Sequence, residues 1–281
     1  MIPVLLDLFE NIPIIKRLVT VQPEYNEIAT NNTNNAVVWI SSPLWTNILA
    51  SFAMVVYYKF AIELACFVRT KNWTGEQPKP IENISRNVLH LFFSSVIIFW
   101  PYFDQSCWSW KLAALLPAVI LSRLIYKGAI VGDPSDADVL NLSLSGSPSD
   151  LLLGPFLLAG VFFWLTLYQF MTEEAAIISA MCFGDGLAPL VGSLYGRHFF
   201  NVPFGSVKTI EGSVFVFLGT VVACYFNLYI LGIPLLPLRI ILAYGGIAAV
   251  AEGTSPANLD NLITPIVLHF SIERVKELLP P

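Results

Sequence analysis

The chain has 281 residues, of which 56% are hydrophobic and only 12% are charged, and its formal net charge is −5 at pH 7. Soluble domains carry roughly 25% charged residues, so this composition excludes an ordinary soluble domain. It also excludes a disordered chain, which needs low hydrophobicity, and a nucleic-acid-binding protein, which needs a basic face. We therefore expect an integral membrane protein with no nucleic-acid partner.

The N-terminal part of the chain differs from the rest. Residues 1–20 alternate apolar and charged positions at helical spacing. This pattern predicts either an amphipathic helix on the bilayer surface or a cap packed on other helices. The Asn-rich stretch 30–35 indicates a linker. We therefore assign residues 1–36 to an amphipathic segment with its linker, and residues 37–281 to a transmembrane domain.

Apolar stretches of spanning length fill the rest of the chain. A bilayer core of about 30 Å needs roughly 20 apolar residues per helix. The stretches that meet or approach this length are 37–67, 87–103, 110–130, 151–170, 174–195, 213–232, 234–251 and 259–272. The first is long enough to project from the membrane, and the last contains Pro265. We expect an all-α helical bundle with about seven to nine transmembrane helices.

The polar connections indicate the orientation of this bundle. Eight crossings place residues 68–86, 131–150, 196–212 and 252–258 on one side. That side, with the adjoining ends of the spans, holds more of the Lys and Arg residues than the other. The positive-inside rule therefore favours it as the cytoplasmic side.

A carboxylate interrupts one of the apolar stretches. Asp185 lies between Gly184 and Gly186 inside the fifth stretch, where a carboxylate costs about 2.5–3.5 kcal/mol on insertion scales. Such a residue normally faces a wet cavity and binds a cation, and the flanking glycines allow close backbone approach. The alternative is an Asp that is hydrogen-bonded to a neighbouring helix, with glycines that serve only packing.

A polar loop follows this stretch. Arg197 and Lys208 bracket it, and Thr209, Gly212 and Ser213 follow at the start of the next apolar stretch. These residues could hold phosphates through guanidinium, ammonium, hydroxyl and backbone N–H groups. Thr209 could instead cap the next helix, and Lys208 could meet lipid headgroups.

Two further acidic positions belong to the same expected membrane face. Glu211 lies beside Lys208, and Asp260 precedes Asn261 at the start of the last apolar stretch. Asp260 or Asn261 could simply cap a helix. Carboxylates alternating with cations are, however, what a magnesium-bound polyphosphate requires. The sequence has no GxxxxGK[ST] and no GxGxxG motif, which excludes a P-loop or a Rossmann site.

Three blocks carry a family resemblance. They are Gly184-Asp185-Gly186-Leu187-Ala188, Lys208-Thr209-Ile210-Glu211-Gly212-Ser213, and Asp260-Asn261-Leu262 through Pro265. In this order they resemble the polyprenol kinase family, which includes dolichol, phytol and farnesol kinases and a CTP-dependent diacylglycerol kinase. The family is distantly similar to the CDP-diacylglycerol synthases. The resemblance covers about residues 82–267.

Two earlier elements extend the resemblance. Arg86 through His90 is similar to the Arg-Lys…His element of the family, although Asn87 replaces the usual Lys. Residues 150–155 are similar to the Glu-Leu-Leu-x-Gly-Pro element of phytol and farnesol kinases. Glu211 stands where phytol kinases often have Ala and where dolichol and diacylglycerol kinases usually have Glu. The blocks therefore point to different alcohols.

The resemblance implies a kinase that transfers the γ-phosphate of CTP, with UTP as an alternative donor, to the hydroxyl of a dolichol-, phytol- or farnesol-type alcohol at the cytoplasmic membrane face. It implies Mg²⁺ bound by Asp185 and Asp260, with Glu211 as a further ligand. The expected catalytic residues are Asp185, Lys208, Asp260 and His90, and either Asp185 or His90 accepts the proton. The expected nucleotide-binding residues are Gly184, Gly186, Arg197, Thr209, Gly212, Ser213, Asn261 and Arg86.

Other functions stay open at this point. They are a cytidylyltransferase that forms a CDP-lipid, a CTP-dependent diacylglycerol kinase, and a transporter in which Asp185 and Glu252 relay ions or protons. The expected partners are the lipid alcohol, the nucleoside triphosphate, membrane lipids and a second copy of the chain. We expect the endoplasmic reticulum as the location, with the plastid envelope as the alternative.

Overall fold

The computed structural model describes residues 42–71, 84–202, 207–256 and 258–279. The predicted amphipathic segment and linker, residues 1–36, lie outside the described residues. The helices are α4 (Pro43–Lys71), α5 (Ile84–Ser94), α6 (Leu115–Ile125), α7 (Ala137–Leu142), α8 (Gly154–Tyr168), α9 (Glu173–Tyr195), α10 (Ile210–Ile230), α11 (Leu238–Thr254) and α12 (Asp260–Leu278). Shorter turns of helix extend them: η1 (Ser95–Tyr102), η2 (Trp108–Ala114), η3 (Tyr126–Val131) and η4 (Pro148–Leu152).

A small antiparallel hairpin joins α9 to α10. Its strands are β1 (Phe199–Asn201) and β2 (Val207–Thr209), and Phe200 pairs with Lys208 in its register. The predicted all-α bundle is confirmed, and this hairpin is an addition to it.

Six helical segments within the described residues are long and apolar enough to cross a membrane. They are Pro43–Thr70, Ile84–Tyr102, Trp108–Val131, Pro148–Tyr168, Glu173–Tyr195 and Ile210–Ile230. These segments correspond to the first six expected stretches, so the chain is a polytopic membrane protein. The last two stretches form α11 and α12, which do not meet the same criterion. α11 has only 17 residues, and the last turns of α12 are highly charged.

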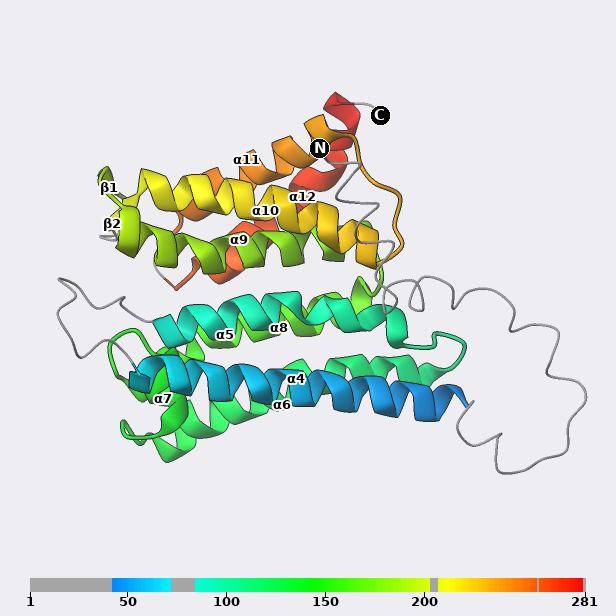
Figure 1. Cartoon of the computed structure of the whole chain (residues 1–281), viewed down its shortest axis with the longest axis horizontal. Helices are drawn as coiled ribbons and strands as arrows, with labels where there is room; N and C mark the ends of the chain where they lie inside the picture. The colour runs from blue at the N-terminus through cyan, green and yellow to red at the C-terminus, as the bar shows by residue number, and fades with distance from the viewer. Residues whose placement is uncertain (1–41, 72–83, 203–206, 257, 280–281) are drawn as a thin grey trace, which may run out of the picture. The chain divides into compact units, whose positions relative to one another are not determined.

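Consecutive long helices run in opposite directions (Figure 1). The starts of α5, α10 and α12 therefore lie at the same end of the bundle as the ends of α9 and α11 and the hairpin. α10 packs against α9 and α11, α12 packs against α11 and α8, and α5 packs against α4 and α9. This arrangement brings segments that are far apart in sequence to one end.

α9 and α10 approach closely because glycines lie where they cross. A Cβ atom on Gly184 would lie 2.5 Å from the carbonyl oxygen of Val216, and one on Gly219 would lie 2.8 Å from the Cα atom of Gly184. Small residues allow this kind of backbone contact in membrane bundles. The crossing fixes the position of the neighbouring Asp185.

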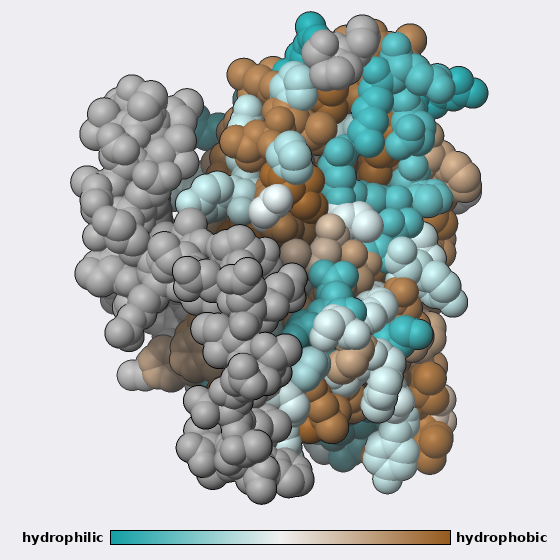
Figure 2. All heavy atoms as spheres, turned by 90° about the vertical axis from the view of Figure 1, so that its right-hand side faces the viewer, coloured by the Kyte–Doolittle hydropathy of each residue, from teal (hydrophilic) through white to brown (hydrophobic). Residues whose placement is uncertain are grey.

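The opposite end of the bundle, which faces the viewer in Figure 2, carries a group of hydrophilic residues among hydrophobic ones. Ion pairs at this end hold α12 against the start of α9. Lys276 Nζ lies 3.2 Å from Glu173 Oε1, and His269 Nδ1 contacts Glu174 Oε1. Thr172 caps α9 by accepting a hydrogen bond from the backbone N–H of Ala175 at 3.3 Å.

Candidate active site

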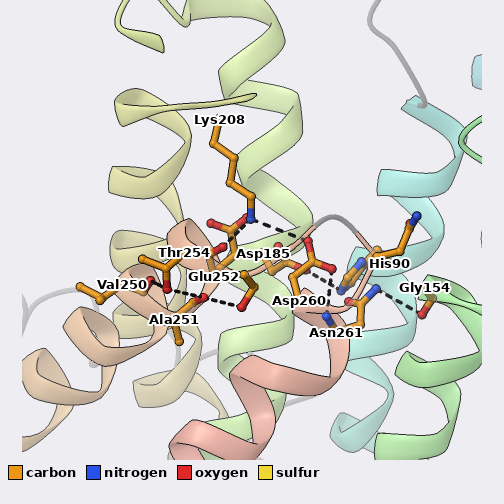
Figure 3. Close-up of polar contacts among 12 residues, drawn as sticks. His90, Gly154, Asp185, Lys208, Val250, Ala251, Glu252, Thr254, Asp260 and Asn261 are labelled. Atoms are coloured by element: carbon orange, nitrogen blue, oxygen red, sulfur yellow. Dashed lines mark hydrogen bonds and ion pairs between the residues drawn. The ribbon is translucent and has the colours of Figure 1, made fainter. Parts of the chain in front are cut away.

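Three carboxylates from three helices meet at the hairpin end of the bundle (Figure 3). Asp185 lies within α9, Glu252 lies near the end of α11, and Asp260 begins α12. One oxygen of each carboxylate lies within 4.8 Å of the others. Like charges at this separation repel each other, so the group needs cations around it. The structure brings Asp185 and Asp260 together, and the third carboxylate beside them is Glu252.

Lys208 of β2 supplies one of these cations. Its Nζ atom donates hydrogen bonds to the backbone oxygen and to Oε1 of Glu252, and it lies 3.8 Å from Asp260 Oδ2. Burial raises the pKa of the Glu252 carboxyl, although the Lys208 ammonium acts in the opposite direction. The Lys208 ammonium and the nearby Arg86 guanidinium together do not balance three carboxylates, and the group can therefore accept a further cation.

α5 supplies two more side chains, His90 and Arg86. His90 Nε2 lies 3.5 Å from Asp185 Oδ2 and has no hydrogen-bond partner among the described residues. Arg86 Nη2 donates a hydrogen bond to Asn258 Oδ1 at 3.4 Å, and its charge interacts with Asp260 and Asp185. The predicted Arg86 and His90 therefore lie beside the carboxylates.

The turn between α11 and α12 is fixed by two asparagines. Asn258 has a φ of 68°, a left-handed conformation that Asn tolerates better than most residues. Asn261 donates a hydrogen bond from Nδ2 to the Gly154 carbonyl oxygen at 3.2 Å, and its backbone N–H donates to Asp260 Oδ1 at 2.9 Å. A Cβ atom on Gly154 would lie 2.8 Å from Arg86 Nη2, so a larger residue at the start of α8 would displace the Arg86 guanidinium.

The structure places Glu211 away from the carboxylate group. Its side chain accepts a hydrogen bond from the backbone N–H of His198 at 3.3 Å, and its Oε1 atom lies 2.7 Å from His198 Nδ1. The geometry therefore does not support Glu211 as a ligand of a cation held by Asp185 and Asp260. Arg197 is exposed and makes no ion pair within the described part of the chain.

The predicted hydroxyl and glycine positions after the hairpin have structural roles. Thr209 caps α10, because its Oγ1 atom accepts a hydrogen bond from the Gly212 N–H at 3.1 Å. A Cβ atom on Gly212 would lie 2.9 Å from the same Oγ1 atom. The Ser213 hydroxyl is buried and has no partner among the described residues. Of this set, Ser213 is the residue with a free hydrogen-bonding group.

The two glycines that flank Asp185 pack against neighbouring helices. Gly184 lies against α10, and a Cβ atom on Gly186 would lie 3.0 Å from Leu91 Cδ2 of α5. Packing therefore explains both glycines, which is the alternative that the sequence leaves open. The contact of Gly186 with α5 also brings His90 next to Asp185.

Sequence reasoning missed three contributors to this arrangement: Glu252 as the third carboxylate, Asn258 as the partner of Arg86, and Gly154 as the contact point of Arg86 and Asn261. Glu252 and Asn258 lie in a polar interruption between two apolar stretches. Gly154 belongs to the Gly-Pro block of the family resemblance. These signals indicate functional segments but do not show which side chains meet.

The chain has relatives among curated kinases. A phytol kinase of Synechocystis sp. is 33% identical over 189 residues, which cover 65% of this chain and 75% of the relative. Probable phytol kinase 2, chloroplastic, of Oryza sativa is 31% identical over 136 residues, which cover 47% of this chain and 44% of the relative. Farnesol kinase, chloroplastic, of Arabidopsis thaliana is 25% identical over 136 residues, which cover 47% of this chain and 43% of the relative.

The chain spans less than half the length of these plant relatives. No family model and no solved structure matches it. The cyanobacterial relative, in contrast, is matched over three quarters of its length. Together with the three sequence blocks and the six spanning helices, this similarity shows that the chain belongs to the phytol and farnesol kinase family of polyprenol kinases.

Proposed function

We propose that this protein is an isoprenoid-alcohol kinase, which transfers the γ-phosphoryl group of a nucleoside triphosphate to the hydroxyl of a phytol- or farnesol-type alcohol. The observation that carries the proposal is the group of Asp185, Glu252 and Asp260 with Lys208 at one end of a membrane bundle. The relatives named phytol kinase and farnesol kinase support this acceptor class over dolichol and diacylglycerol. CTP as the donor, with UTP as the alternative, rests on the family resemblance.

The carboxylate group fits a magnesium ion. Asp185, Glu252 and Asp260 offer hard oxygen donors within 4.8 Å of one another, and their three negative charges exceed the two positive charges of Lys208 and Arg86 beside them. These three residues would hold the ion, with Glu252 in place of Glu211. When bound, magnesium supplies charge neutralisation for the phosphate oxygens.

The basic residues of the site then have distinct roles. Lys208 keeps Glu252 and Asp260 together and presents its ammonium to a phosphate bound beside them. Arg197 is exposed just before the hairpin, where its guanidinium can bind phosphate oxygens in a bidentate way. Arg86 adds positive charge from α5, and the free Ser213 hydroxyl can donate a hydrogen bond. Phosphoryl transfer needs mainly this kind of alignment and charge balance.

The position of the site at one end of the bundle suits a lipid substrate. Drawing a prenyl chain into water costs about 0.8 kcal/mol per CH₂ group. An acceptor that stays in the bilayer can present its hydroxyl to the end of the bundle without this cost. We place this end at the cytoplasmic side or its plastid equivalent, and the relatives named chloroplastic favour the plastid envelope over the endoplasmic reticulum.

The decisive experiment is an assay of detergent-purified protein with Mg²⁺. Labelled CTP, UTP and ATP are each offered with phytol, farnesol, dolichol and diacylglycerol. We expect CDP and a phytyl or farnesyl monophosphate as the products. Pyrophosphate with a CDP-lipid would support the cytidylyltransferase instead, and solute uptake into liposomes without nucleotide would support a transporter.

A further inference from the structure

A small cavity lies beside the carboxylate group. It has a volume of about 30 Å³, and α5, α6, α8 and the start of α12 contribute to its wall. Its lining combines the polar side chains of Arg86, His90 and Asn261 with apolar side chains such as those of Phe93, Leu158 and Ala159. A single water needs about 10–15 Å³ by the same measure. The cavity therefore has room for a group of two or three heavy atoms, such as a hydroxymethyl end.

One of the lining residues carries a buried atom without a hydrogen-bond partner. The His90 side chain is only 9% exposed, and its Nε2 atom has no hydrogen-bond partner among the described residues. Buried polar atoms in native proteins nearly always have a partner, so this atom indicates a ligand. Because the same atom lies 3.5 Å from Asp185 Oδ2, a ligand bound to it lies next to the carboxylate group.

The start of α8 builds one wall of the cavity. Pro155 lines it, and the preceding Gly154 allows Arg86 and Asn261 to pack directly against the helix end. Pro155 of the Gly-Pro block that resembles phytol and farnesol kinases therefore borders the cavity, and Gly154 contacts Arg86 and Asn261 beside it. This location is what a determinant of the acceptor alcohol requires.

We propose, building on the kinase function above, that this cavity receives the hydroxyl end of the acceptor alcohol. The hydroxyl hydrogen-bonds to His90 Nε2, and the first carbons of the chain pack against Phe93, Leu158 and Ala159. During transfer the hydroxyl oxygen forms a bond to the γ-phosphorus. The bond from that phosphorus to the bridging oxygen breaks, and its electron pair leaves with the nucleoside diphosphate. The hydroxyl proton is released to water at this end of the bundle.

A larger groove between α11 and α12 is the rival location. It has a volume of about 660 Å³ and is lined mostly by apolar residues such as Ala243 and Val267. Its two hydroxyl residues already donate to their own helices, Thr254 to the Val250 carbonyl oxygen and Ser271 to the Val267 carbonyl oxygen. The groove thus offers the reacting hydroxyl no charged or imidazole side chain.

The first test fills the cavity. Ala159 is fully packed against it, whereas the adjacent Gly160 has open space where a Cβ atom would lie. We expect Ala159→Leu to raise the KM for phytol and farnesol at least tenfold, with the Kd for the nucleotide unchanged. Gly160→Leu, the matched control on the same helix, should keep both constants close to those of the unsubstituted protein.

The second test enlarges the cavity, and it decides the matter if Ala159→Leu does not fold. Leu158→Ala should raise kcat/KM for alcohols that branch next to the hydroxyl carbon, relative to phytol. Ala159→Leu, which fills the cavity, should have the opposite effect on the preference for branched alcohols over phytol. A merely structural role of Leu158 would lower the activity with all alcohols equally.

The third test removes the hydrogen bond at His90. His90→Phe keeps an aromatic ring but cannot hydrogen-bond to the hydroxyl, and we expect it to raise the KM for the alcohol at least tenfold with the Kd for the nucleotide unchanged. His90→Gln keeps a hydrogen-bonding group and should raise this KM less. Equal effects of the two substitutions on the KM would contradict the hydrogen bond.

The outcomes also separate this inference from the proposed function. If the unsubstituted protein phosphorylates no lipid alcohol, both fall together. If it does, but Ala159→Leu behaves like Gly160→Leu, only the cavity assignment is overturned. A photoreactive prenyl alcohol gives the direct readout: we expect it to label Phe93 or Leu158, and labelling of Ala243 or Val267 instead would move the acceptor to the groove.

Discussion

Lys208 Nζ lies 3.8 Å from Asp260 Oδ2 while it donates hydrogen bonds to Glu252, so one side chain of the hairpin joins the end of α11 to the start of α12. The side chains of Lys208, Glu252 and Asp260 are 14%, 9% and 18% exposed. At this burial, water screens the charges little, and the ammonium and the carboxylates depend on each other.

Lys208→Gln should therefore destabilise the protein in a metal-dependent way. Without the ammonium the two carboxylates face each other unpaired, and we expect a loss of about 1–3 kcal/mol in EDTA. Added Mg²⁺ should restore most of this loss. Thermal unfolding in detergent with and without Mg²⁺ measures both effects. Lys276→Gln, which breaks the ion pair with Glu173 at the other end of the bundle, is the control and should show no magnesium dependence.

Asp185→Asn should abolish most of the kinase activity without unfolding the protein. The substitution keeps the side-chain size but removes a charge that holds the cation, and a fall in kcat of roughly 100- to 1,000-fold is expected. Initial rates at saturating Mg²⁺ and nucleotide measure it. Glu174→Gln removes a carboxylate from the same helix at its far end and should leave kcat almost unchanged. Near-normal turnover by the Asp185 variant would contradict the site.

The third carboxylate can be identified by comparing two glutamates. Glu252→Gln should weaken the apparent Mg²⁺ affinity at least about tenfold, because Glu252 lies in the carboxylate group. Glu211→Gln should leave that affinity unchanged, because Glu211 contacts His198 instead. Magnesium titrations of the reaction rate distinguish the two, and the reverse result would return Glu211 to the site.

Two glycines with different surroundings should respond in opposite ways to substitution by alanine: Gly184 lies at the crossing of α9 and α10, and Gly160 faces open space. Gly184→Ala places a Cβ atom 2.5 Å from the Val216 carbonyl oxygen, so the helices must separate, at a cost of about 1–3 kcal/mol. Gly160→Ala meets open space within α8 and should stabilise the helix by about 0.5–1 kcal/mol. Thermal unfolding of both variants measures the difference. Equal stability of the two would contradict the close crossing.

The bundle could be predicted from the sequence because its signal is local. Each spanning helix is an apolar run of sufficient length, and six of the expected runs cross by that criterion. Asp185 was recognisable for a related reason, since a carboxylate inside such a run is costly and seldom accidental. Whether α11 and α12 cross the membrane was harder to predict. α11 is short and the end of α12 is charged, so neither sequence clearly distinguishes a spanning helix from a connection.

The partners of Asp185 could not be predicted in the same way. Asp260 reaches it only because the turn at Asn258 returns α12 alongside α11. Glu211 is held against His198 because the backbone N–H of Ile210 bonds to the His198 carbonyl oxygen as the hairpin closes. Strands of three residues give almost no periodic signal, so charge pattern alone does not reveal this pairing.

The contributions of α5, α9, α11 and α12 to one site have a consequence for biosynthesis. Asp260 begins α12, so a ribosome must synthesise the chain at least as far as α12 before the carboxylates can assemble. A nascent or truncated product that ends before this residue lacks part of the chemistry. Assembly of the carboxylate group thus requires α9, α11 and α12 together, and under the proposed kinase function a product that stops before α12 should not turn over nucleotide.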